Sequence, residues 1–193
     1  SYEQINKELI SAKIELQKLA KDLEVKNKKL EKLAHIDGLT EVYNHRYFQN
    51  FLETEIRRSL RKQTSVSLVL MDIDHFKGFN DNYGHQTGDF ILKEICKLMK
   101  KNIRDYDIVA RYGGEEFAVV LVETTQEDAL KIAEKLRESI ETNIFIDGIK
   151  EYKVTASFGV ATMLSPKSDF KNSDLIEYAD KALYESKKKG RNR

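Results

Sequence analysis

Two acidic clusters in the middle of the chain contain the residue types expected of a site for a divalent cation and phosphate groups. The first is Gly113-Gly114-Glu115-Glu116, which lies between two apolar, strand-like segments. A Gly-Gly pair between two such segments predicts a hairpin turn. Glycines admit a ligand close to the backbone because they lack a Cβ. The adjacent carboxylates would repel a phosphate unless a cation lay between them, so the turn suits a metal and nucleotide site.

The second cluster is Asp72-Ile73-Asp74, which follows a short apolar segment of the buried-strand type at residues 67–71. Asp72 and Asp74 are two residues apart, so on a strand their side chains point to the same face. Carboxylate oxygens suit Mg²⁺, which is usually held by one or two carboxylates plus substrate phosphates. Lys77 adds positive charge nearby. Either cluster alone could be a solvated acidic turn, but together they predict one cation site built from two strands.

Residues 35–193 resemble the GGDEF domain family in its Gly-Gly-Glu-Glu-Phe form, through several motifs that occur in the family's order. The matching segments are Asp37-Gly38-Leu39-Thr40 with Asn44-His45-Arg46, Asp72 to Lys77 with Asn80-Asp81, Tyr83-Gly84-His85 with Gly88-Asp89, the Gly-Gly hairpin, and Ala179 to Tyr184 with Lys187, Gly190 and Arg191. Active members are bacterial diguanylate cyclases, which join two GTP molecules into cyclic di-GMP and release two pyrophosphates. The resemblance implies the same reaction for this chain.

The resemblance also implies which residues hold the metal. Asp72, the backbone carbonyl of Ile73 and Glu115 would bind Mg²⁺, with Mn²⁺ as the alternative ion. Glu116 would assist metal binding or removal of the 3′-hydroxyl proton. Asp74 would support the metal ligands or belong to an ordinary turn. Metals of this kind neutralise phosphate charge and lower the pKa of an attacking hydroxyl.

The substrate contacts are likewise implied by the resemblance. Asn80 and Asp89 match the guanine contacts, and an aspartate pairs with the N1 and N2 edge of guanine but poorly with adenine. Phosphate contacts would come from Lys77, Lys187, Arg191 and the backbone N–H groups of His75 and Phe76. Lys187 and Arg191 continue an apolar stripe with a spacing of four residues, so we expect both to point inward. The alternative interpretations are turn chemistry around Asn80 and a solvated basic tail at residues 187–189.

An inhibitory site for the product is a further implication of the resemblance. Arg104-Asp105-Tyr106-Asp107 matches the family's Arg-x-x-Asp motif, in which Arg104 and Asp107 would bind cyclic di-GMP. Arginine can pair bidentately with a phosphate or a guanine edge. Arg137 is one suggestion for a second arginine, which the sequence does not identify. The alternative is a surface ion pair.

The first 34 residues have the pattern of a coiled coil. Apolar residues alternate at spacings of three and four over more than four heptads, with Lys26 as the polar exception: Tyr2, Ile5, Leu9, Ala12, Leu16, Leu19, Leu23, Lys26, Leu30 and Leu33. We therefore divide the chain into a signalling and dimerisation helix, residues 1–34, and a catalytic domain, residues 35–193. A parallel homodimer would place two catalytic domains side by side. The alternative is one amphipathic helix packed on its own domain.

The pattern of residues 35–193 predicts an α+β fold. Strands are expected at residues 66–74, on both sides of the Gly-Gly pair and at residues 152–162. Helices are expected at residues 47–62, from Gly88, from 125 to about 142, and from 172 to near Gly190. The order corresponds to a βαββαβ, ferredoxin-like sheet of the nucleotide-cyclase palm type, with helices on one face.

Composition excludes several other classes of protein. The net charge of +1 gives no field for nucleic acid or membrane, and no apolar segment is long enough for a bilayer. The single cysteine, Cys96, makes no intrachain disulfide, which fits a reducing cytoplasm. The chain begins without methionine, so we expect an upstream sensor or receiver domain in a longer protein.

Three other functions are compatible with parts of this pattern. A receptor for GTP or cyclic di-GMP without catalysis would be expected to lack the acidic residues that this chain keeps. A plain dimerisation module would leave the acidic hairpin unexplained. A related cyclase with mixed nucleotide substrates is disfavoured by Asp89 but not excluded.

Overall fold

The computed structural model describes residues 2–163 and 170–193, and these form two compact units, residues 1–36 and 37–193. The first unit is a single helix, α1 (Tyr2–His35), which confirms the helix predicted from the heptads. Its apolar seam is exposed, with Leu9, Leu16 and Leu23 each at least 60% accessible. The side chains of Ile5 and Leu33 lie outside the described set. In the described residues, no helix is long and apolar enough to cross a membrane.

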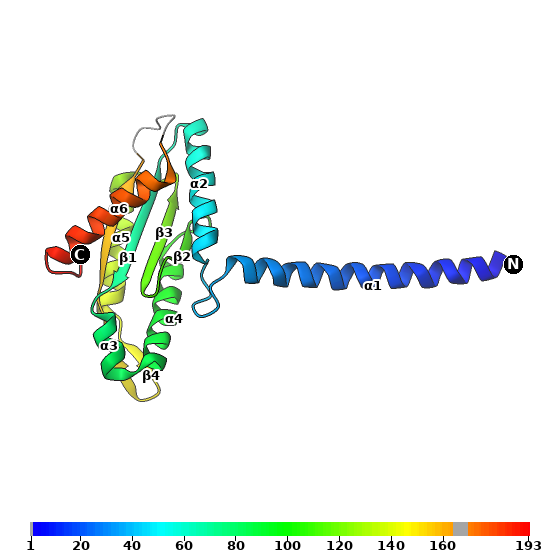
Figure 1. The fold of residues 1–193 in the computed structure, drawn as a ribbon, viewed down its shortest axis with the longest axis horizontal. Coiled ribbons are helices and arrows are strands. Elements are labelled where there is room, and N and C mark those ends of the chain that lie inside the picture. Colours follow the sequence, from blue (N-terminus) through cyan, green and yellow to red (C-terminus); the bar gives the residue numbers. More distant parts are fainter. Residues whose placement is uncertain (1, 164–169) are drawn as a thin grey trace. The chain divides into compact units, whose positions relative to one another are not determined.

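The second unit is built on a four-stranded antiparallel sheet (Figure 1). Its strand order is β2-β3-β1-β6, formed by β1 (Val66–Ile73), β2 (Ile108–Arg111), β3 (Glu116–Val122) and β6 (Ala156–Thr162). All eight residues of the central strand β1 are buried, as expected for a continuous apolar strand that is covered on both faces. The predicted hairpin, palm-type sheet and α+β class are confirmed.

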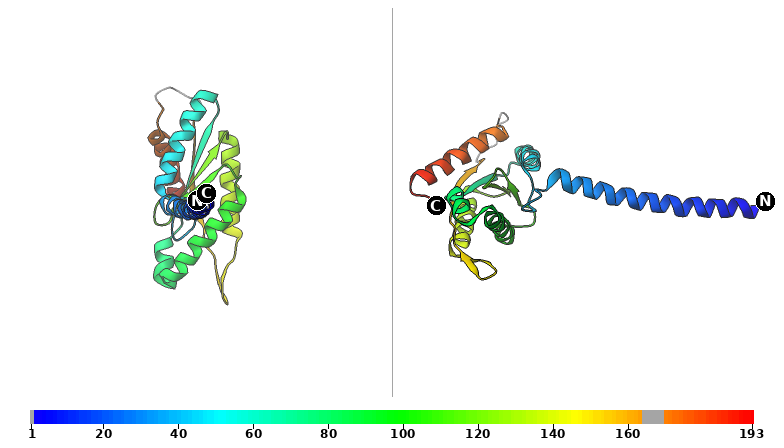
Figure 2. Two further views of the ribbon diagram at one scale, coloured as in Figure 1. Left: turned by 90° about the vertical axis from the view of Figure 1, so that its right-hand side faces the viewer. Right: turned by 60° about the horizontal axis from the view of Figure 1, so that its bottom comes forward.

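Helices cover both faces of the sheet, so the expectation of helices on one face is wrong. One face packs against α4 (His85–Asn102) and α5 (Gln126–Thr142), the two crossover helices. The other face packs against α2 (His45–Lys62) and α6 (Asn172–Lys188) (Figure 2). The βαββαβ core accounts for α4 and α5 alone, and the flanking helices bury the second apolar face of β1, which bears Leu68 and Leu70.

Three short elements were not predicted from the sequence. Helix α3 (Phe76–Tyr83) follows β1 and ends at Gly84, immediately before α4. Strands β4 (Phe145–Asp147) and β5 (Lys150–Tyr152) form a separate hairpin around the expected Asp147-Gly148 turn. The segment expected as one strand from residue 152 is therefore divided, and β6 begins only at Ala156.

Close packing of α6 on β6 depends on Gly159. A Cβ at this position would lie 2.2 Å from the carbonyl oxygen of Ala179 and 2.3 Å from the backbone nitrogen of Leu183. Both atoms belong to the helix backbone and cannot rotate away. The helix therefore approaches the strand as near as a hydrogen side chain permits, which fixes the position of the C-terminal half of α6.

Candidate functional site

The ends of β1 and of the β2–β3 hairpin bring the two acidic clusters together. Asp72 pairs with Glu116 across β1 and β3, and Glu115 directly precedes Glu116 in the turn. From the other side, α6 contributes Lys187, whose Nζ lies 2.8 Å from Oδ2 of Asp72. The structure thus brings together three acidic residues and one lysine, of which Asp72 and Lys187 are 115 residues apart in the sequence.

Crowding of negative charge affects the protonation of Glu115. Its pKa is raised by burial and by the nearby carboxylates of Asp72 and Glu116, while Lys187 acts in the opposite direction. A cation placed here would relieve this repulsion. In the part of the chain that the structure describes, no three His, Cys, Asp or Glu side chains form a metal-binding group. Two carboxylates with the carbonyl of Ile73 nevertheless fit Mg²⁺, which takes its remaining ligands from water and phosphate.

Asp74 has a different environment from Asp72. Its carboxylate accepts hydrogen bonds from the hydroxyl groups of Thr155, at 2.7 Å, and Ser157, at 2.6 Å. Its own backbone N–H donates to the carbonyl of Thr155. Asp74 therefore fastens the loop after β1 to the start of β6.

Arg111 and Asp37, to which the sequence analysis assigned no role, shape the acidic turn. Arg111 donates to the carbonyl oxygens of Gly113 and Gly114, at 3.2 and 2.7 Å, and also pairs with Asp37. Burial opposes ionisation of Asp37, but hydrogen bonds from Thr40 and the charge of Arg111 hold its pKa below the usual range. This role of Arg111 could have been predicted from its place two residues before the Gly-Gly pair, because the backbone carbonyls of glycines are open to a nearby guanidinium.

The first glycine of the pair is needed for close contact with Glu116. A Cβ on Gly113 would lie 2.5 Å from Oε2 of Glu116, whereas a Cβ on Gly114 would meet nothing within 4 Å. Gly113 thus permits the carboxylate to fold back over the turn. Gly114 is exposed and leaves open space.

The loop between β1 and α3 makes a tight turn at His75. His75 adopts a left-handed conformation, with φ of +57°, and directly precedes α3. The first N–H groups of a helix lack intrahelical acceptors, and those of α3 are next to the acidic cluster in the chain. Lys77 lies exposed on the first turn, whereas the side chain of Phe76 is buried.

Helices α3 and α4 pack together around Asn80, one of the two predicted guanine contacts. The Oδ1 atom of Asn80 is buried and has no hydrogen-bond partner among the residues that the structure describes, which is costly unless a ligand supplies a donor. Its amide lies against Gly88, where a Cβ would be only 1.9 Å from Oδ1. Asp89, the second predicted contact, is the next residue and is exposed.

The expectation that Lys187 and Arg191 both point inward is correct for Lys187 and wrong for Arg191. Lys187 is half-buried and reaches Asp72. Helix α6 ends at Lys188, and Arg191 lies beyond it with φ of +64° and an exposed side chain. Arg191 therefore does not extend the helical stripe, because the chain turns at Gly190, whose φ is +112°.

At the expected inhibitory motif, Asp107 is a buried acceptor. It receives the N–H groups of Val122, at 3.0 Å, and Arg104, at 3.3 Å, and burial raises its pKa. The guanidinium of Arg104 contacts the exposed ring of Tyr106. Arg137, the suggested second arginine, is engaged by Glu134 and Glu141 on its own helix.

An antiparallel palm-type sheet with acidic residues at the ends of two neighbouring strands defines a nucleotide-cyclase class of domain. The family model described as "Diguanylate cyclase, GGDEF domain" matches residues 34–193. The chain therefore belongs to the GGDEF domain family of diguanylate cyclases.

Several known proteins are similar to the chain. Diguanylate cyclase A of Treponema denticola is 40% identical over 173 residues, which cover 88% of this chain and 46% of that protein. The probable diguanylate cyclase DgcT of Escherichia coli is 38% identical over 83% of this chain and 35% of that protein. The chain thus spans less than half the length of these two relatives.

A solved structure also extends the likeness to α1. The coiled coil and GGDEF domain of DgcB from Caulobacter crescentus, determined in complex with c-di-GMP, has a TM-score of 0.84 and 30% identity. The match covers 98% of this chain and 97% of that one. It therefore includes the N-terminal helix as well as the domain.

Proposed function

We propose that the chain is the catalytic part of a diguanylate cyclase, which condenses two GTP molecules into cyclic di-GMP and two pyrophosphates. The observation that carries the proposal is the convergence of Asp72, Glu115 and Lys187 at the ends of β1 and the hairpin. Such a cluster supplies ligands for a cation and a counter-charge for phosphate in one place. Family membership and the named relatives support the same activity.

The acidic residues prepare the site for the attacking 3′-hydroxyl and the α-phosphate. Asp72, the Ile73 carbonyl and Glu115 would hold Mg²⁺ or Mn²⁺, which when bound neutralises phosphate charge and lowers the pKa of the hydroxyl. Glu116 lies beside Glu115 and could accept the hydroxyl proton. Asp74 keeps the loop in place through Thr155 and Ser157. The protein's contribution is thus mainly positioning and charge.

Selection of GTP is assigned to the junction of α3 and α4. The buried, unpartnered Oδ1 of Asn80 needs a donor, and guanine offers one in its N2 amino group. The carboxylate of Asp89 would accept from N1 and N2. Adenine lacks the same pair of donors and would leave these acceptors unsatisfied, which rejects it.

Phosphate binding is assigned to the two segments that meet at the acidic cluster. Lys77 and the first N–H groups of α3 would contact the triphosphate from one segment. Lys187 and Arg191 would contact it from the end of α6. The ammonium of Lys187, now paired with Asp72, would turn to phosphate when a cation neutralises that carboxylate.

The reaction joins two GTP molecules, so we infer that it requires two catalytic domains facing each other. The exposed seam of α1 would form a parallel coiled coil in a homodimer. An upstream sensor or receiver domain would set the geometry of that dimer, in the cytoplasm. Cyclic di-GMP would then limit its own synthesis by binding at Arg104, with Asp107 holding the shape of the turn.

Incubation with GTP and Mg²⁺, followed by chromatography of the products, tests the proposal. We expect cyclic di-GMP from the parent, none from Glu115→Ala, and the parent's amount from Glu123→Ala, which removes an exposed carboxylate at the far end of β3. Parallel reactions with ATP, alone and mixed with GTP, test the substrate. GTP binding without any product would indicate a receptor, and mixed cyclic dinucleotides would contradict strict GTP selection.

A further inference from the structure

The last three residues run back along the domain instead of continuing the direction of α6. Gly190, Arg191 and Asn192 all have positive φ, at +112°, +64° and +49°. This sharp turn lays Arg193 beside the edge strand β6, where its carbonyl oxygen accepts the N–H of Phe158 at 2.8 Å. The C-terminal segment is thereby hydrogen-bonded to the sheet.

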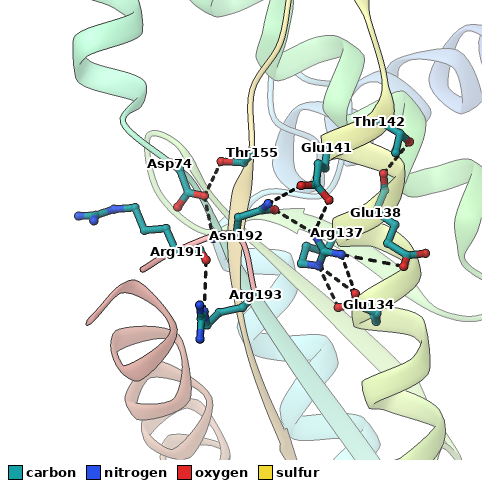
Figure 3. Close-up of polar contacts among 10 residues, drawn as sticks. All are labelled: Asp74, Glu134, Arg137, Glu138, Glu141, Thr142, Thr155, Arg191, Asn192 and Arg193. Atoms are coloured by element: carbon teal, nitrogen blue, oxygen red, sulfur yellow. Dashed lines mark hydrogen bonds and ion pairs between the residues drawn. The ribbon is translucent and has the colours of Figure 1, made fainter. Parts of the chain in front are cut away.

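Asn192 is the residue of this segment that connects separate elements. Its backbone N–H donates to Oδ2 of Asp74 at 3.2 Å. Its side-chain amide donates to Oε1 of Glu141 at 2.7 Å and accepts from Nη1 of Arg137 at 3.0 Å (Figure 3). We call this group of contacts the C-terminal latch, comprising Asn192, Asp74, Glu141 and Arg137. It joins the end of α6 to the loop after β1 and to α5.

The latch orients the end of α6 relative to the acidic cluster. Figure 3 shows the side chain of Arg191 directed away from Arg137, while Asn192 points toward it. Two consecutive residues thus carry a side chain assigned to phosphate, Arg191, and a side chain hydrogen-bonded to α5, Asn192. Asparagine suits this position because it adopts the left-handed conformation more readily than most residues.

We propose that Asn192 is a positioning residue for the substrate triphosphate, an inference that rests on the proposed cyclase function. Among the described residues, two polar contacts connect α6 and the segment that follows it with the end of β1 and the loop after it: Lys187 to Asp72, and the backbone of Asn192 to Asp74. The first contact is lost when Lys187 turns from Asp72 to phosphate. The second involves no group assigned to the substrate, so it holds Lys187 and Arg191 in place while the first is broken.

An ordinary surface role does not account for all of these contacts. Arg137 pairs with Glu134 and Glu141 within α5, and such helix pairs contribute little by themselves. The contacts through Asn192 instead cross between elements that are 51 to 118 residues apart. Asn192 is itself only partly buried, so shortening its side chain leaves no sealed void in the core.

The test measures binding of 3′-deoxy-GTP, which lacks the attacking hydroxyl and cannot be cyclised. Asn192→Ala keeps the backbone N–H that donates to Asp74 but removes the side-chain bonds to Glu141 and Arg137 that hold this backbone in place. For this variant we expect the Kd for the analogue and the KM for GTP to rise about tenfold, with kcat within about twofold of the parent. Asn172→Ala, at the other end of α6, removes an asparagine amide bonded to Gln49 and is the matched control. Thermal melting of each variant corrects the values for any unfolded fraction.

Variants that exchange the donor and the acceptor of the Asn192–Glu141 hydrogen bond distinguish a positioning role from a contribution to stability alone. Asn192→Asp alone places a carboxylate against Glu141 and should weaken binding more than alanine does. Adding Glu141→Gln restores a donor and acceptor in exchanged positions, so the double variant should recover most of the parent's affinity. A structural role alone would alter melting temperature without this pattern in Kd and KM.

The outcomes also separate this inference from the proposed function. A parent that makes cyclic di-GMP while Asn192→Ala keeps the parent's Kd and KM would overturn the latch and leave the cyclase standing. Failure of the parent itself to bind 3′-deoxy-GTP would overturn both. Recovery in the double variant, with unchanged behaviour of Asn172→Ala, would support the latch.

Discussion

Residue 88 decides whether Asn80 can occupy its place at the proposed guanine site. The absent side chain leaves room for Oδ1 of Asn80, which would otherwise lie 1.9 Å from a Cβ. Glycine inside a helix normally costs about 1 kcal/mol relative to alanine. Gly88 therefore lowers the stability of α4 but leaves the space that the side chain of Asn80 occupies.

For Gly88→Ala we expect the affinity for 3′-deoxy-GTP to fall about tenfold or more, because Asn80 must turn away from the base. Stability to urea should stay near that of the parent, since the helix gains what the contact loses. Isothermal titration and urea unfolding measure the two quantities. Gly38→Ala is the control, because a Cβ there meets nothing within 4 Å and the residue lies outside the proposed nucleotide contacts. Unchanged affinity in Gly88→Ala would refute the assignment of Asn80.

At the scale of the elements, the position of α6 depends on the close contact between its backbone and Gly159 of β6. Helix α6 carries Lys187 to Asp72, and its own position depends on Gly159 in β6. A Cβ at this glycine collides with two backbone atoms of the helix, so relief requires movement of the whole element rather than of one rotamer.

We therefore expect Gly159→Ala to destabilise the domain by about 1–3 kcal/mol, the range for overpacking a close contact. Displacement of α6 should also raise the KM for GTP in the fraction that remains folded. Urea unfolding and initial rates measure both effects. Gly38→Ala, with no atom within 4 Å of its Cβ, should behave like the parent. A variant at position 159 with the parent's stability would show that the helix can shift freely.

The sequence predicted elements best where local pattern and burial agree. The apolar segments of β1 and β3 and the Gly-Gly turn predicted the sheet, because alternating or continuous apolar residues reflect burial directly. Helix α3 was missed because Asn80, Asp81 and Asn82 favour turns when read locally. The end of the last helix near Gly190 was predicted, but the outward direction of Arg191 was not, because the four-residue stripe was extended past the end of α6 at Lys188.

Site residues were predicted from the sequence where they matched a motif. The structure adds residues that hold other site residues in position. Asp72 and Glu115 could be named from the sequence and lie together as the prediction requires. The roles of Arg111 and Asn192 depend on partners far away in the chain, such as Asp37 and Asp74. No local pattern specifies those pairings, since they arise only when the sheet and its helices have assembled.

At the scale of the whole molecule, the exposed seam of α1 is the surface through which we propose that two chains associate. Its seam leaves Leu16, Leu19 and Leu23 between 60% and 69% exposed. Burying a leucine side chain stabilises an assembly by about 1.5–3 kcal/mol, so a helix with this seam favours association. Outside the seam, α1 also exposes the large apolar side chains of Ile10, Ile14 and Val25.

Association through α1 predicts that the rate of cyclic di-GMP synthesis depends on the seam. Leu16→Asp introduces a charge at its centre and should convert a dimer to a monomer, as sedimentation velocity would report. The rate per chain should fall at least about tenfold at low protein concentration, because each reaction needs two domains. It should recover as concentration rises, since the catalytic residues are untouched. Gln17→Asp adds the same charge outside the seam and should leave both quantities unchanged. Full activity in monomeric Leu16→Asp would contradict the requirement for a dimer held by α1.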